Sequence, residues 1–176
     1  MENGLIKCGK FIKEIKELIH KHQYEAMKQV NKGLLHLYWE IGEEIYLRQN
    51  EQGWGKSVVE ILSSELQKEF PGNSGFSARN LWLMRNFYNE YSKNQILQPM
   101  VAEFEKTTHK AILPPLVAEI SWTKNCIIIE KCKDPLQREF YIKTTKKFGW
   151  TKDVLDAFSH FRTNRTSSIS RFRIIA

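Results

Sequence analysis

The chain has 176 residues, enough for one domain, or two small ones, with a buried core. Its composition is 41% hydrophobic and 27% charged, which indicates an ordinary folded protein and excludes a disordered one. No apolar run approaches the roughly 20 residues that span a bilayer, and the first residues contain no signal-peptide core. We therefore expect a cytoplasmic protein with no membrane partner.

The net charge of +7 is typical of a nucleic-acid-binding protein, but it is unevenly distributed. Residues 1–158 carry only +3, whereas residues 159–176 carry four arginines and no acidic residue. We expect this tail to be disordered, either as a basic arm that binds phosphates or as the divergent end of a truncated or frameshifted product. The abrupt change in residue usage favours the second interpretation. Overall charge is therefore no independent support for nucleic-acid binding.

Helical periodicity runs from Phe11 to Ile45, with apolar residues three and four positions apart. This pattern predicts one long helix, or two nearly continuous helices, ending near Gln49. A helix of this length commonly packs lengthwise against a partner. We therefore expect a homodimer through the N-terminal helix.

Shorter helices are predicted after Gly53, so the expected fold class is all-α. Asp134 and Pro135 are typical of a helix start, and Gly149 is typical of the end of the same helix. The predicted helices span residues 56–70, 77–91, 122–132, 135–148 and 151–160, and the proline-interrupted segment 93–115 is a connector.

These helices define one predicted domain over residues 1–158. Within it we expect a helix-turn-helix-like unit at about 56–91 and a further helical unit at about 116–158. A tryptophan followed two residues later by a lysine recurs at three helix starts, namely Trp54-Gly-Lys56, Trp122-Thr-Lys124 and Trp150-Thr-Lys152. Packing of each tryptophan on its own helix explains the pattern better than three ligand contacts. The recurrence hints that the second unit resembles the first.

The segment 56–91 carries the candidate functional site. Two amphipathic helices joined by a glycine-containing break at 71–75 are typical of a helix-turn-helix reader of nucleic acid. Ser77 is a good N-cap for the second helix, and the amides that it leaves exposed can face a phosphate.

On a helical wheel, the second helix directs Arg79, Trp82 and Asn86 away from its apolar side, with Arg85 at the edge. Arginine binds guanine edges or phosphates through its planar fork, and asparagine can pair with adenine. The alternative is a solvated amphipathic helix that never touches DNA, with Trp82 covered by a neighbouring element.

Metal and catalytic sites have weaker signals. His36, Glu40, Glu43 and Glu44 could share one helical face, but no second motif supplies further ligands. We interpret them as a solvated helix face, because metal sites need several converging ligands. Phosphate-loop, dinucleotide-binding and metalloprotease motifs are absent from the sequence. We therefore expect neither a metal nor a cofactor.

Several short segments together resemble the N-terminal domain of the YhcG family, bacterial proteins similar to restriction-type nucleases. The matching segments are Leu37-Tyr-Trp-Glu-Ile-Gly42, Gly53-Trp-Gly, Leu66-Gln-Lys-Glu-Phe-Pro-Gly72, Gly75-Phe-Ser-Ala-Arg-Asn-Leu81, Met84-Arg-Asn-Phe87, Lys133-Asp-Pro and Phe140-Tyr141. The resemblance implies a helix-turn-helix, DNA-binding domain that a PD-(D/E)XK nuclease domain normally follows. The match ends near Asp156, and the family's catalytic residues have no counterpart here, so no enzymatic activity is carried over.

The sequence therefore supports two functional hypotheses. The first is a DNA-binding module, and the second is a protein-interaction or dimerisation module that positions a nuclease or restriction subunit. The resemblance also adds Asn80 to the site, although this residue falls on the apolar side of the helix, where it can instead be a buried polar anchor. The candidate DNA-binding residues are Lys56, Lys68, Ser77, Arg79, Asn80, Trp82, Arg85 and Asn86.

Overall fold

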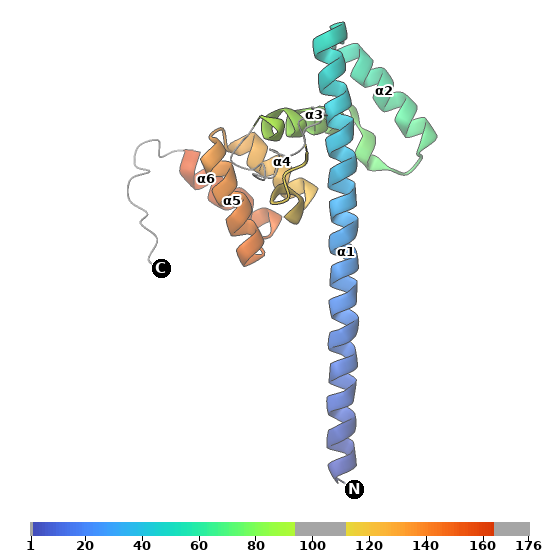
Figure 1. Ribbon diagram of the computed structural model, residues 1–176, viewed down its shortest axis with the longest axis vertical. Helices are drawn as coiled ribbons and strands as arrows, with labels where there is room; N and C mark the ends of the chain where they lie inside the picture. Colours follow the sequence, from blue (N-terminus) through green and yellow to red (C-terminus); the bar gives the residue numbers. More distant parts are fainter. Residues whose placement is uncertain (1, 94–111, 164–176) are drawn as a thin grey trace, which may run out of the picture.

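The computed structural model describes residues 2–93 and 112–163, with side chains described for 9–93 and 112–158. A single helix, α1, forms a rod, and the other helices pack around its C-terminal half (Figure 1). The regular elements are α1 (Glu2–Gln52), α2 (Lys56–Glu69), the 3₁₀ turn η1 (Ser74–Phe76), α3 (Ala78–Ser92), the 3₁₀ turn η3 (Val117–Glu119), α4 (Trp122–Lys131), α5 (Pro135–Phe148) and α6 (Lys152–Thr163). The predicted all-α fold is confirmed, since every regular element in these ranges is helical.

The predicted helices agree closely with the observed ones. The N-terminal pattern forms one continuous helix rather than two, and it ends at Gln52. The Asp134 side chain caps α5 by accepting a hydrogen bond from the Gln137 amide at 3.0 Å, with Pro135 in the first turn. Gly149 ends that helix in the left-handed conformation, at φ 62°. Local capping chemistry therefore sets these boundaries, as expected.

Two predicted segments lie partly outside the described residues. Residues 94–111, most of the predicted connector, lie outside the described ranges. Residues 112–116 are described and contain no regular helix. Helix α6 continues to Thr163, five residues into the predicted tail, and residues 164–176 lie outside the described ranges.

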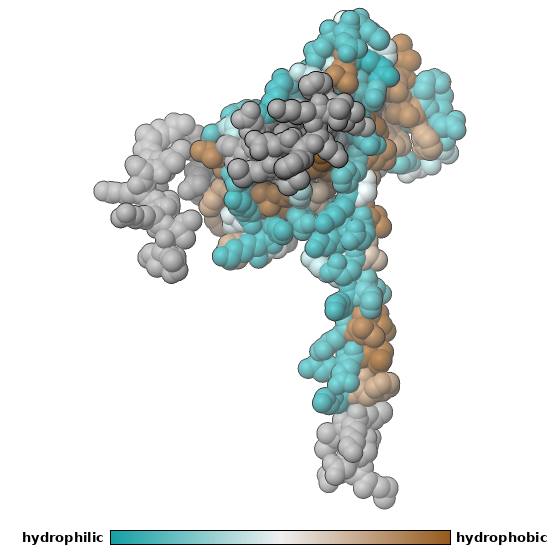
Figure 2. Space-filling model, viewed as in Figure 1, coloured by the Kyte–Doolittle hydropathy of each residue, from teal (hydrophilic) through white to brown (hydrophobic). Residues whose placement is uncertain are grey.

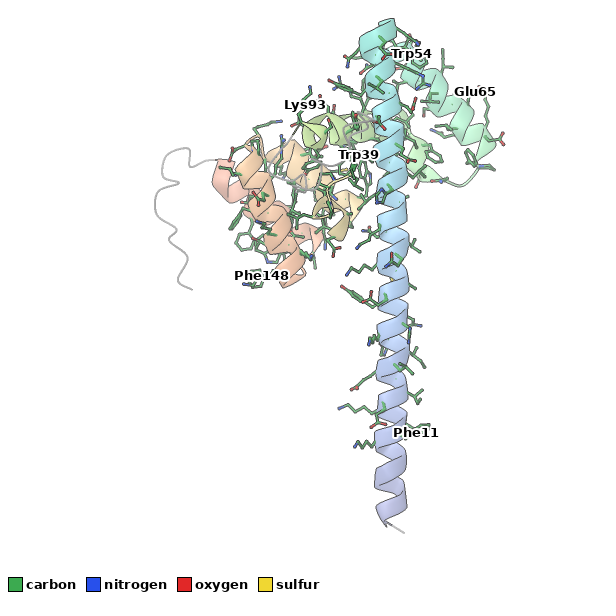
Figure 3. The ribbon with its side chains drawn as sticks, in the orientation of Figure 1. Phe11, Trp39, Trp54, Glu65, Lys93 and Phe148 are labelled. Atoms are coloured by element: carbon green, nitrogen blue, oxygen red, sulfur yellow. The ribbon has the colours of Figure 1, made fainter. Side chains whose placement is uncertain are left out.

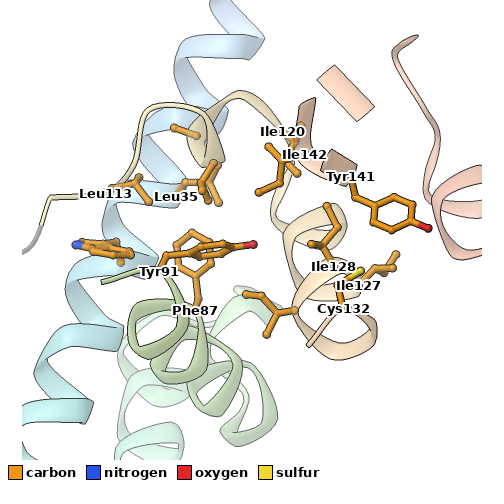
Figure 4. Close-up of a cluster of buried hydrophobic side chains, with 14 of the residues drawn as sticks. Leu35, Phe87, Tyr91, Leu113, Ile120, Ile127, Ile128, Cys132, Tyr141 and Ile142 are labelled. Atoms are coloured by element: carbon orange, nitrogen blue, oxygen red, sulfur yellow. The ribbon is translucent and has the colours of Figure 1, made fainter. Parts of the chain in front are cut away.

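Helix α3 lies at the centre of the packed body, between α1, α2 and α4. The body has two hydrophobic clusters, and buried side chains of α3 contribute to both of them. The larger cluster joins Leu35 of α1 and Phe87 and Tyr91 of α3 to Ile128 of α4 (Figure 4). The smaller cluster, on the α2 side, consists of Tyr38, Ile45, Val59, Phe76, Leu81 and Met84.

Trp122 connects the two clusters. Its indole packs edge-on against Tyr38 at a centroid distance of 4.8 Å and against Phe87 at 5.2 Å. Edge-to-face contacts at these distances are favourable geometries for aromatic rings. The first residue of α4 is therefore anchored to both α1 and α3.

The crossing of α1 and α3 depends on Gly42. A Cβ atom at this position would lie 2.7 Å from the Met84 carbonyl carbon and closer still to its oxygen. The two backbones can approach this closely only because residue 42 lacks a side chain. Next to the crossing, the Tyr88 hydroxyl donates a hydrogen bond of 3.1 Å to the buried Glu43 carboxylate.

The thiols of Cys126 and Cys132 are buried and unpaired with each other. Burial raises the pKa of Cys126 to about 12 and that of Cys132 to about 11. Both residues therefore stay protonated at neutral pH and act as small packing residues.

Glu119 of η3 joins α1 to α5 through three lysines. Its carboxylate lies 2.8 Å from Lys32 Nζ and 3.5 Å from both Lys28 Nζ and Lys146 Nζ. The hydrogen bond from Lys32, helped by the nearby lysine charges and opposed by partial burial, lowers the pKa of Glu119 below 4.5. This ion-pair cluster connects η3 and α5 to the middle of α1.

No helix in the described ranges is long and apolar enough to cross a membrane.

We expect Gly42→Ala to lower the free energy of unfolding by about 3 kcal/mol or more, because the added methyl group forces α1 and α3 apart. Gly33→Ala is the matched control, since a Cβ there meets nothing within 4 Å. In a helix interior that exchange should be neutral or stabilising by up to about 1 kcal/mol. Urea denaturation followed by circular dichroism measures both changes, and equal effects would contradict the close approach.

We expect Glu119→Gln to remove part of the acid sensitivity of the fold. A carboxylate whose pKa is lowered by folding contributes stability above its unfolded value near 4.5, and this contribution is lost as the pH falls through the lower folded value. Stability measured by denaturation between neutral pH and the acid range should therefore fall less steeply in the variant. Glu60→Gln changes an exposed carboxylate of α2 and should keep the wild-type slope.

Candidate nucleic-acid interface

The connection between α2 and α3 is longer than a standard helix-turn-helix turn. It spans residues 70–77, whereas such turns usually have about three or four residues. Gly72 adopts φ 85°, and the Asn73 side chain accepts a hydrogen bond of 3.0 Å from the Gly75 amide. Ser63 of α2 donates a hydrogen bond of 2.8 Å to the Phe76 carbonyl. The connection is therefore an ordered loop fastened to α2.

Ser77 caps α3 as predicted, because its hydroxyl accepts a hydrogen bond of 3.3 Å from the Asn80 amide. Just before it, Gly75 packs so closely that a Cβ atom would lie 2.7 Å from the Tyr38 hydroxyl oxygen. The backbone before α3 is consequently held against α1. Ser77 itself is exposed.

Asn80 is half-buried at the start of α3, where it joins three elements. Its amide nitrogen donates a hydrogen bond of 2.5 Å to the Gly75 carbonyl, and its amide oxygen accepts one of 2.8 Å from Trp122 Nε1. The donor and the acceptor of this side chain are both used internally. Asn80 is therefore a polar anchor, as its place on the apolar side of the wheel suggested, although it is half-buried rather than buried.

Arg79 extends into solvent from the first turn of α3, with 84% of its side chain exposed. Its guanidinium lies near Glu130 of α4, at 3.9 Å between Nη2 and Oε1. An exposed ion pair at this distance contributes well under about 1 kcal/mol. Arg79 can therefore exchange Glu130 for another anion at little cost.

Trp82 and Arg85 make internal contacts despite their place on the polar side of α3. Trp82 is half-buried and packs against the smaller cluster. Arg85 Nε donates a hydrogen bond of 2.9 Å to the Gln49 side chain of α1, and the guanidinium lies 5.3 Å from the centre of the Tyr46 ring. Asn86 accepts a further hydrogen bond of 3.2 Å from Arg85.

Lys56 and Lys68 lie at opposite ends of α2, about 18 Å apart along the helix axis. Both are exposed, and Lys68 forms an ion pair of 2.7 Å with Glu65. The structure thus divides the eight predicted residues among several locations, and their contact with DNA stays a prediction.

A cleft of about 570 Å³ opens beside the start of α3. Ser77 and Arg79 line it from α3, and Thr123 and Lys152 line it from the starts of α4 and α6. Glu130 and Asp156 also line the cleft, and Asp156 forms an ion pair of 2.5 Å with Lys131. The cleft therefore has a mixed charge, with exposed cations at its edge. We call it the α3 cleft.

Sequence reasoning missed Thr123 and Lys152. They belong to the segments Trp122-Thr-Lys124 and Trp150-Thr-Lys152, two of the three in which a lysine follows a tryptophan by two residues, and which we attributed to packing alone. Trp150 packs on its own helix as predicted, stacking on Phe158 at 4.8 Å. Trp122 instead packs against Tyr38 of α1 and Phe87 of α3. Thr123 and Lys152, from these same segments, nevertheless line the cleft, and only the tertiary arrangement brings them to Arg79.

A smaller cleft of about 330 Å³ lies further along α3, where Arg85 and Asn86 face Lys133. Its wall includes the buried Arg138, which donates hydrogen bonds to Glu90 at 2.5 Å and to the Cys132 carbonyl at 2.7 Å. These bonds commit Arg138 to joining α5 to α3. Lys133 is left as an exposed cation of this cleft.

Within the described side chains, no group of three or more histidine, cysteine or acidic residues could hold a metal ion. This includes the helix face of α1 considered from the sequence, where Glu43 instead bonds Tyr88.

We expect Asn80→Ala to destabilise the fold by about 2 kcal/mol, because it leaves Trp122 Nε1 and the Gly75 carbonyl without their partner. Arg79→Ala, one residue earlier and exposed, should change the free energy of unfolding by less than about 0.5 kcal/mol. Chemical denaturation of both variants tests the assignment. A stable Asn80→Ala protein would show that Asn80 does not anchor the loop.

Comparison with known proteins adds the family. A family model described as the DUF1016 N-terminal domain matches residues 14–161, from the exposed part of α1 into α6. This match confirms the resemblance to the YhcG N-terminal domain, and it includes no nuclease domain. Neither a curated protein nor a solved structure matches the chain. On the strength of the match over most of its length, the chain belongs to the DUF1016 N-terminal domain family.

Proposed function

We propose that this chain is a DNA-binding module, in which the start of α3 and the edge of the α3 cleft contact the phosphate backbone. The observation that carries the proposal is the exposure of Arg79 in the first turn of α3, beside the Ser77 cap and Lys152. A helix N-terminus with an adjacent arginine favours phosphate oxygens. Family membership agrees with a module that works together with a nuclease.

In this proposal the first turn of α3 makes the contacts, rather than the whole helix. Recognition helices of helix-turn-helix proteins use mainly their N-terminal residues for base contacts. Further along α3, Trp82 packs against the smaller cluster and Arg85 is bonded to α1, so both residues support the helix instead. Lys133 and Asn86 at the smaller cleft would extend this protein–DNA contact along the phosphate backbone of the DNA.

The charge of the surface limits how strong this binding can be. Glu130 and Asp156 lie in the same cleft as Arg79 and Lys152, so the local field is weaker than that of a purely basic groove. Asp156 is already paired with Lys131, and Glu130 is only weakly paired with Arg79. We therefore expect moderate, salt-sensitive binding.

Binding to a fluorescent DNA duplex, measured by anisotropy over a range of salt concentrations, tests the proposal. Removing two phosphate contacts with Arg79→Ala and Lys152→Ala should reduce the slope of log K against log salt by about 2. The double variant Lys13→Ala and Lys21→Ala removes the same charge from the exposed part of α1 and should retain the wild-type slope. Absence of binding by the wild type at low salt, or equal slopes for both variants, would rule out the α3 cleft.

A protein-interaction module that positions a nuclease or restriction subunit is the second candidate function. The observation that favours it is the exposed apolar face of α1, which the described body leaves uncovered. In that case the Arg79 and Lys152 substitutions would have no effect on function, and the apolar face of α1 would be required.

A further inference from the structure

The N-terminal part of α1 projects from the body and carries a row of exposed apolar side chains. Figure 3 shows Phe11 on this projecting part, far from Trp39 at the packed end of the helix. We call this row the α1 stripe, and its members are 39–73% exposed: Phe11, Ile12, Ile15, Leu18, Ile19, Val30, Leu34 and Leu37. From Phe11 to Leu37 the stripe is about 39 Å long, or seven helical turns.

The stripe faces away from the protein's own body. At 100° per residue, its centre lies roughly opposite the face that carries Leu35, Trp39 and Gly42, which pack against the body. Figure 2 shows apolar residues along the outer edge of α1, with the body on the other side. Helix α2 covers this side only near the end of α1, where Ile41 packs into the smaller cluster.

This part of α1 receives no packing from the rest of the described chain. Residues 9–27 are exposed on every face of the helix. Most helical stability in proteins comes from packing an amphipathic face, and an unpacked helix of this length is marginal in water. The ion pairs Lys10–Glu14 and Lys13–Glu17, at 3.9 and 3.8 Å on the surface, add only a few tenths of a kcal/mol each. A partner along the stripe would supply the missing packing.

When two copies of the stripe are aligned antiparallel, the sizes of the side chains that face each other are complementary. With a two-fold axis between His22 and Gln23, Ile19 lies opposite Ala26 and Ile15 lies opposite Val30 of a second copy. Bulky residues of the first half thus meet smaller residues of the second half, which is the condition for dense packing. A parallel pair would instead set Ala26 against Ala26 and leave space between the helices.

The charged residues beside the stripe are compatible with this pairing. With the axis between His22 and Gln23, Lys16 lies level with Gln29 and Glu25 lies level with His20 of the second copy, so neither of these charged residues meets a like charge. The aliphatic stem of a lysine can also cover an apolar neighbour while its ammonium group stays in water. No residue of the stripe itself is charged.

We propose that a second copy of this chain packs antiparallel along the α1 stripe, forming a two-helix dimer with the two bodies on the outside. The proposal gives the apolar face of the second candidate function a specific partner, and it does not depend on DNA binding. It would place two α3 clefts on one assembly related by a two-fold axis, as in an isologous dimer.

Sedimentation analysis without DNA tests the dimer. Ile15→Gln with Ile19→Gln makes the stripe polar without changing the net charge, at positions that touch nothing in the described body. We expect the wild type to have twice the monomer mass, and the variant's dissociation constant to rise about a hundredfold or more. Lys13→Gln with Glu17→Gln is the matched control on another face, and it should remain dimeric.

Helix content gives a second readout on the same proteins. Because the projecting part of α1 is marginal alone, the stripe variant should lose helical circular dichroism while the control retains it. A wild type that stays monomeric at every concentration would overturn the proposal. If that monomeric wild type also binds phosphatidylcholine–phosphatidylserine vesicles through the stripe, the occupant of the stripe is a membrane surface and not a second copy.

Disulfide cross-linking tests the antiparallel direction in a Cys8→Ser background. His22→Cys lies next to the proposed axis and should cross-link to its copy under oxidation. Phe11→Cys should not, since antiparallel pairing separates the two copies of residue 11 by about 35 Å and a disulfide needs Cα atoms within about 7 Å. Efficient cross-linking through Phe11→Cys would indicate a parallel pair and overturn the proposal.

Discussion

The contact between the backbones of α1 and α3 at Gly42 is the constraint on which the other parts of the body depend. It lets α3 lie deep enough to contribute Phe87 and Tyr91 to the larger cluster while Leu81 and Met84 fill the smaller one. Because the two clusters share this helix, neither half of the body has a core of its own. The position of α3 in turn decides which of its residues can meet a ligand.

Because α3 is packed between other helices, most of its polar side is not free to contact DNA bases. Gln49 and the Tyr46 ring hold Arg85, and the smaller cluster takes up Trp82. In the first turn, Arg79 stays exposed at the edge of the cleft that the starts of α4 and α6 also line. The outcome is a short exposed helix start at the edge of a cleft, a geometry suited to phosphate oxygens more than to a long run of bases.

Helix α1 has two different environments along its length. Its C-terminal half is a structural element, tied to η3 and α5 through the Glu119 cluster and to α3 at Gly42. Its N-terminal half carries apolar side chains on the opposite face, where the body cannot reach them. One continuous helix therefore joins a folded body to an exposed apolar surface, so binding along the stripe would fix the position of the body as well.

The helices could be predicted from the sequence because helix periodicity and caps are local: Asp134, Pro135 and Gly149 act within a few residues of their own helix. Short motifs were also sufficient to predict the family. The role of each site residue could not be predicted in this way, because a helical wheel shows the direction of a side chain but not which other segment packs there. Asn80 became an internal anchor and Arg85 a contact to α1, whereas Lys152, 73 residues after Arg79 in the sequence, joined it at one cleft. These outcomes depend on packing between distant segments, which no local pattern encodes.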